Sequence, residues 1–196
     1  MTYSPQQAHM GQPVPNTAPQ PPTQAPKQVG AAAAFLIALA VLTIAAAVVE
    51  FAAISAFVSN FEDKTGATLA ELDADVSVGG ATYTSLAAAA LLIIMALLVR
   101  AGVGAGRVIG LVLAILSILG TLVGMILTMV VLDDADTLEY LMDVTGLLPG
   151  WYAPAALGIG VLQIVVAILA IVKLANKQAK QWMAAKKLAA AVQPAA

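Results

Sequence analysis

Four long apolar segments divide the chain, and shorter polar segments connect them. The apolar segments cover about residues 31–58, 81–99, 108–132 and 152–172. A helix rises about 1.5 Å per residue and the hydrocarbon core is roughly 30 Å thick, so each segment is long enough to cross a bilayer. The first is longer than a crossing requires, and we expect it to tilt or protrude. The pattern predicts an all-α membrane protein, built as a four-transmembrane-helix bundle.

Charged residues sort by sign between the two ends of these segments. Ten of the eleven acids lie in the loops 59–80 and 133–151, with Lys64 as the only cation there. The other eight cations flank the opposite ends of the apolar segments: Lys27, Arg100, Arg107, Lys173, Lys177, Lys180, Lys186 and Lys187. Because Lys and Arg resist translocation, we expect both termini to be cytoplasmic and the acidic loops to be extracytoplasmic.

The segments outside the membrane differ in composition. Residues 1–28 hold seven of the ten prolines and six glutamines, so we expect a disordered cytoplasmic tail. Pro19, Pro21 and Pro22 leave open a role as a docking peptide for a Pro-binding groove. Residues 29–174 form the predicted transmembrane domain. Residues 175–196 are predicted to continue the last span as a basic cytoplasmic helix or tail.

The third and fourth apolar segments carry stripes of small and weakly polar residues at spacings of three and four. In the third they are Gly110, Ala114, Ser117, Thr121, Gly124 and Thr128, with Gly120 beside them. In the fourth they are Ala156, Gly160, Gln163, Ala167 and Ala170. Small residues permit close helix approach within lipid, where hydrophobicity does not drive association. We expect the stripes to face each other or the bundle centre; the rival interpretation is a docking face for another membrane protein.

Glu50 is the only ionisable residue inside an apolar segment. It shares a helix face with Thr43, Ala46 and Ala53, so it is predicted to point into the bundle. Intramembrane carboxylates are costly and often functional. Glu50 is therefore a candidate coupling carboxylate for protons or substrate. The alternative is a structural glutamate near the outer interface, either protonated or accepting a hydrogen bond from Ser or Thr.

The remaining polar residues indicate which partners and which chemistry to expect. The cluster Lys173, Lys177, Lys180, Lys186 and Lys187 suits anionic lipid headgroups at the cytoplasmic face. The acidic exterior argues against a nucleic-acid partner. There is no cysteine, and the single histidine, His9, lies in the tail. With no catalytic triad, metal-ligand spacing or phosphate loop, we expect no enzyme activity, cofactor or metal site.

The Pro/Gln-rich tail, the Ala/Val/Gly-rich spans and the basic, glycine-rich turn from Arg100 to Gly110 resemble small four-span membrane proteins common in actinobacteria. That resemblance implies a multi-pass protein of a bacterial cytoplasmic membrane and carries no shared activity. Small multidrug-resistance exporters also have four helices and a membrane-embedded Glu in the first. In this chain Glu50 lies off-centre, and the loops and tails are longer.

These patterns lead to one expected function and two alternatives. The scarcity of catalytic groups and the small-residue stripes favour an accessory or scaffold subunit of a larger membrane or envelope complex. Its partner would be another membrane protein or a second copy of the chain. The first alternative is a small oligomeric proton-coupled transporter or exporter that uses Glu50. The second is a stress sensor that reports through the tail or the basic C-terminal segment.

Overall fold

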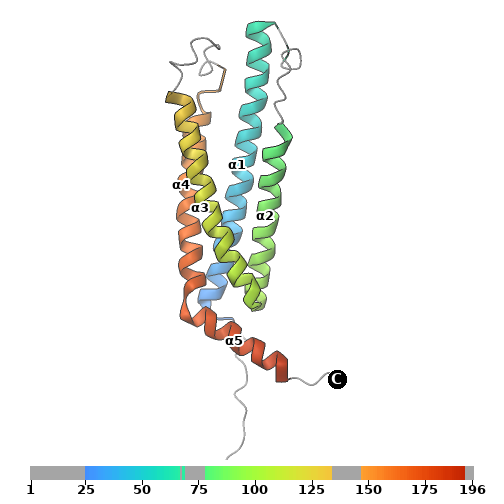
Figure 1. Cartoon of the computed structure of the whole chain (residues 1–196), viewed down its shortest axis with the longest axis vertical. Helices are drawn as coiled ribbons and strands as arrows, with labels where there is room; N and C mark the ends of the chain where they lie inside the picture. The colour runs from blue at the N-terminus through green and yellow to red at the C-terminus, as the bar shows by residue number, and fades with distance from the viewer. Residues whose placement is uncertain (1–24, 67, 69–77, 134–146, 193–196) are drawn as a thin grey trace, which may run out of the picture.

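Five helices make up the part of the chain that the computed structural model describes, residues 25–66, 68, 78–133 and 147–192. They are α1 (Lys27–Thr65), α2 (Val78–Ala101), α3 (Gly104–Asp133), α4 (Tyr152–Ala175) and α5 (Lys177–Val192). α1 packs against α2 and α4, and α3 packs against the same two helices. Helices α1 to α4 thus form an up-down-up-down bundle, and α5 runs across one of its ends (Figure 1).

Within the described residues, the four helices α1 to α4 are long and apolar enough to cross a membrane. Large apolar side chains are exposed on their outer faces, among them Val41, Leu97, Leu119 and Val172. Such surfaces need lipid as their solvent. The prediction of an all-helical protein is confirmed, with four long apolar helices that could span a membrane, and this architecture indicates a multi-pass membrane protein.

α1 is longer than the predicted span because its stop signals lie further out. At its start, the carbonyl oxygen of Pro26 accepts hydrogen bonds from the backbone N–H groups of Val29 and Gly30. At its end, Gly66 adopts a left-handed conformation with φ of 67°, and its N–H bonds the Glu62 carbonyl. Glycine tolerates this conformation best. The 39 residues between these signals reach about 58 Å at about 1.5 Å per residue.

The basic C-terminal segment is helical, as predicted, but it does not continue the last span without a break. α4 ends at Ala175, and Asn176 has an extended backbone with ψ of 139°. The Asn176 side-chain oxygen then accepts a hydrogen bond from the backbone N–H of Gln178 at 2.9 Å, which caps the next helix. The basic segment is therefore a separate helix, α5, that turns beneath the bundle (Figure 1), and Lys173 belongs to α4.

The turn between α2 and α3 fits closely against α5. Gly102 has a φ of 85°. A Cβ at this position would lie 2.8 Å from the Lys186 Cδ and 2.9 Å from the Trp182 ring. Both the backbone conformation and the close approach therefore require glycine. This turn fixes where α5 docks.

The buried core is concentrated in the half of the bundle next to α5. The side chains that are fully buried there include Val29, Leu36 and Leu39 of α1, Val99 of α2 and Leu174 of α4. Trp182 and Met183 of α5 belong to the same cluster. The bundle is thus tightly packed at this end, and the candidate site lies in the opposite half.

Candidate functional site: a cleft between four helices

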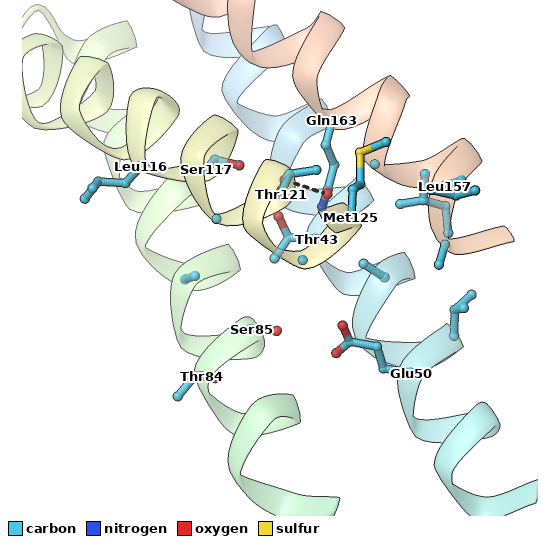
Figure 2. Close-up of a pocket in the computed structure, with 18 of the residues that line it drawn as sticks. Thr43, Glu50, Thr84, Ser85, Leu116, Ser117, Thr121, Met125, Leu157 and Gln163 are labelled. Atoms are coloured by element: carbon cyan, nitrogen blue, oxygen red, sulfur yellow. Dashed lines mark hydrogen bonds between the residues drawn. The ribbon is translucent and has the colours of Figure 1, made fainter. Parts of the chain in front are cut away.

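A cleft of about 520 Å³ lies between helices α1 to α4, in the half of the bundle away from α5. All four helices contribute to its wall, which is mainly apolar. Eight of the lining residues carry polar side-chain atoms: Thr43, Glu50, Thr84, Ser85, Ser117, Thr121, Tyr152 and Gln163; all but Tyr152 are labelled in Figure 2. A cleft of this composition, between helices long and apolar enough to span a membrane, is the first candidate for a functional site.

The stripe of small residues on α3 explains why the cleft exists. In the first half of the stripe, Ala114 is fully buried, and a Cβ on Gly110 would lie 3.4 Å from Leu36. In the second half, Gly120 and Gly124 line the cleft, and a Cβ on either would meet no atom within 4 Å. The stripe therefore packs closely only near α5. The side chain of Thr128 lies outside the described residues.

The two stripes meet along the seam between α3 and α4. Thr121 donates a hydrogen bond to the Gln163 side-chain oxygen at 3.2 Å, drawn as a dashed line in Figure 2. Gly160 lies beside this bond, where a Cβ would approach Met125 Sδ to 3.0 Å and Thr121 Cγ2 to 3.3 Å. Gln163 is buried, so this bond satisfies one of its polar atoms within the apolar bundle.

Glu50 is half-buried on α1. Its carboxylate points into the cleft, toward the side where α2 carries Ser85 (Figure 2). Thr43, on the same face of α1, donates its hydroxyl to the Leu39 carbonyl of its own helix at 2.9 Å. Among the residues that the structure describes, Glu50 makes no hydrogen bond or ion pair, and the cleft-lining residues include no Lys or Arg. A carboxylate in such surroundings is stabilised by a cation or a hydrogen-bond donor.

Sequence reasoning missed the part of the wall that α2 supplies. Ser85, Ala88 and Leu92 line the cleft. Their spacing of three and four residues places them on one helix face. This spacing was present in the sequence, but Ser85 is the only polar residue of the three, so the pattern did not stand out from an ordinary packing face.

The lysines predicted to contact lipid headgroups separate into two groups. Lys180, Lys186 and Lys187 of α5 line a second cleft, between α5 and the α2–α3 turn. Lys173, at the end of α4, and Lys177, at the start of α5, do not line it. The break at Asn176 separates Lys173 from the helix that carries the other four lysines, and Lys177, the first residue of α5, lies at the end of that helix away from Lys186 and Lys187.

No family model, curated protein or solved structure matches this chain. Across the described ranges, no three His, Cys, Asp or Glu side chains come together in a way that could hold a metal ion. The case for a function therefore depends on the cleft and on the chemistry of the residues around it.

Proposed function

We propose that this protein is a non-enzymatic accessory or scaffold subunit of a larger complex in a bacterial cytoplasmic membrane. The cleft between its four helices would receive side chains from a transmembrane helix of the partner. The observation that carries the proposal is Glu50, a half-buried carboxylate in a cleft whose lining includes no cation. A Lys, Arg or hydrogen-bond donor on the partner helix would neutralise or satisfy it.

The glycines of α3 support the same proposal. At Gly120 and Gly124 there is open space where a side chain would be. Small residues let the backbones of two helices approach closely, and this contact is the main source of helix association within lipid. The exposed position of both glycines makes this part of the wall accessible to another helix.

The distribution of charge supports an orientation for the complex. The α5 end of the bundle carries Arg100, Arg107 and the lysines of α5, whereas Glu62 and Asp63 lie at the far end of α1. Under the positive-inside rule, the α5 end would face the cytoplasm. The cleft would then lie in the outer half of the membrane, so we expect the partner helix to contribute its outer half.

Affinity purification from native membranes in mild detergent tests the proposal. We expect the tagged protein to recover one membrane protein in stoichiometric amount, and Glu50→Gln to reduce that recovery at least about tenfold, since losing a desolvated charge pair costs more than about 1.4 kcal/mol. Glu62→Gln is the matched control, because Glu62 is exposed at the end of α1. Recovery of the wild-type chain alone, after crosslinking, would contradict the proposal.

A second function is favoured by the polar groups around Glu50. Ser85, Ser117 and Thr121 line the same cleft, and its volume of about 520 Å³ lies within the range of roughly 300–1,000 Å³ for small-molecule sites. A small oligomeric proton-coupled transporter would use Glu50 to exchange a proton for substrate. For this function, Glu50→Gln would abolish proton-linked transport while leaving the oligomer intact, whereas an accessory subunit would lose its partner.

A further inference from the structure

The second cleft lies between α5 and the turn that joins α2 to α3, and its volume is about 670 Å³. One wall is formed by residues 101–105 and Arg107, and the other by residues of α5. Its lining includes four cations and no acid: Arg107, Lys180, Lys186 and Lys187. Their like charges repel in the absence of an anion, so this concentration indicates a negatively charged ligand.

We infer that this cleft is a binding site for the phosphate headgroup of an anionic phospholipid. Basic clefts at the cytoplasmic ends of membrane helices bind such headgroups, because each cation near the surface adds to the attraction for phosphate. The inference is independent of the proposed docking of a partner, since the two clefts lie at opposite halves of the bundle.

The position of the cleft along the helices favours a lipid over a soluble anion. It lies where the apolar helix α2 ends, at Ala101, and where α3 begins, at Gly104, which is the level expected for headgroups. Its wall also contains Val103, which is exposed, and Met183. A site that combines cations with apolar side chains suits a headgroup together with the first part of its acyl chains.

Two of the four cations, Arg107 and Lys186, are held in place by the fold. Arg107 Nε donates a hydrogen bond to the Leu174 carbonyl at 2.6 Å, which joins α3 to the end of α4. Lys186 Nζ donates to the Ala101 carbonyl at 3.2 Å and lies 5.2 Å from the centre of the Trp182 ring. Trp182 is itself buried, so α5 is anchored beside the α2–α3 turn, and the Lys186 side chain is positioned there before a ligand binds. Such preorganisation lowers the entropy cost of binding.

The amino end of α3 adds to the positive potential. α3 begins at Gly104, within the wall of the cleft. The helix dipole places partial positive charge at this end, which favours an anion there. No acid occurs in the first turn of α3 to offset it.

Native mass spectrometry of the full-length protein, titrated with phosphatidylglycerol and with phosphatidylcholine of the same acyl chains, tests the inference. We expect phosphatidylglycerol to bind preferentially. We expect the double substitution Lys180→Gln with Lys187→Gln to weaken its binding roughly 30-fold, from two lost cations. The matched control is Lys173→Gln with Lys177→Gln, which removes the same charge from residues outside the cleft and should weaken binding less than about threefold.

Three results would overturn the inference. Equal weakening by the two double variants would show diffuse attraction rather than a site. Equal binding of both lipids to the wild-type chain would show that the cleft does not select a headgroup with net negative charge. Displacement of phosphatidylglycerol by inorganic phosphate at equimolar concentration would assign the cleft to a soluble anion. Thermal unfolding in the same detergent verifies that each variant is folded, and Lys180→Gln alone, with an expected loss of about fivefold, provides the test if the double variant does not fold.

Discussion

Thr121 on α3 and Gln163 on α4 are joined by a hydrogen bond of 3.2 Å, and both line the cleft that also contains Glu50. The bond links two helices at the level where the bundle opens. It provides a polar attachment for α3 in a region where side-chain packing is incomplete. The geometry of the cleft therefore depends on the seam between α3 and α4.

Substitution of Thr121 by Val removes this bond with little change in side-chain volume. We expect the free energy of unfolding to fall by about 0.6 kcal/mol and by no more than about 1.7 kcal/mol, the range for interhelical hydrogen bonds in membranes. Reversible unfolding in bicelles measures the change. Ser55→Ala is the control, because Ser55 is exposed and donates only to the Phe51 carbonyl of its own helix. An equal loss in both variants would mean that the bond does not hold the seam.

Gly160 allows the close approach of α4 to α3. A Cβ here would lie 3.0 Å from Met125 Sδ and 3.3 Å from Thr121, so a branched side chain forces the helices apart. We expect Gly160→Val to lower the free energy of unfolding by about 1–3 kcal/mol through overpacking. On the same helix, a Cβ at Gly158 would have no atom within 4 Å, and Gly158→Val should have little effect. If the two variants behave alike, the seam is not closely packed.

Gly102 positions α5 through its left-handed backbone and its contact with Trp182. We expect Gly102→Ala to destabilise the turn by about 1–3 kcal/mol and to expose α5 to trypsin at Lys180 and Lys186. The rate of this cleavage in purified protein is the measurement. Gly104→Ala is the control, since a Cβ there has open space. Unchanged cleavage in Gly102→Ala would show that α5 does not depend on this turn for its position.

The proposed orientation can be tested directly because the chain contains no cysteine. A single cysteine is therefore a unique label site. We expect Asp63→Cys to react with a membrane-impermeant maleimide in intact cells, and Lys187→Cys to react only after the membrane is permeabilised. Both residues are exposed, so accessibility within the protein is matched. The reverse labelling pattern would place α5 outside.

The four long apolar helices could be predicted from the sequence because an apolar run of about 20 residues has few other stable structures in a lipid environment. The end of α4 could not be predicted from the sequence. Lys177, Gln178 and Ala179 are all good helix formers, so intrinsic propensity favours one continuous helix through Asn176. The break is instead stabilised by tertiary contacts, mainly the burial of Trp182 and Met183 against the base of the bundle.

Only part of the cleft could be predicted from the sequence. The stripes on the third and fourth apolar segments indicated that α3 and α4 meet, and Glu50 was recognised as unusual. A stripe of small residues is nevertheless compatible with close packing or with an opening. Which of the two occurs depends on how the helices diverge along their length. On α3 the same stripe is buried at Ala114 and exposed at Gly120, a difference that residue spacing alone does not encode.

The most direct test of the central claim is photo-crosslinking from within the cleft. A photoreactive amino acid at position 120 would point into the cleft, whereas the same residue at position 119, which is exposed and does not line the cleft, would contact lipid. In native membranes we predict a crosslink to one membrane protein from position 120 and only lipid adducts from position 119. Lipid adducts alone from both positions would contradict the account of this cleft as a docking site for a partner helix.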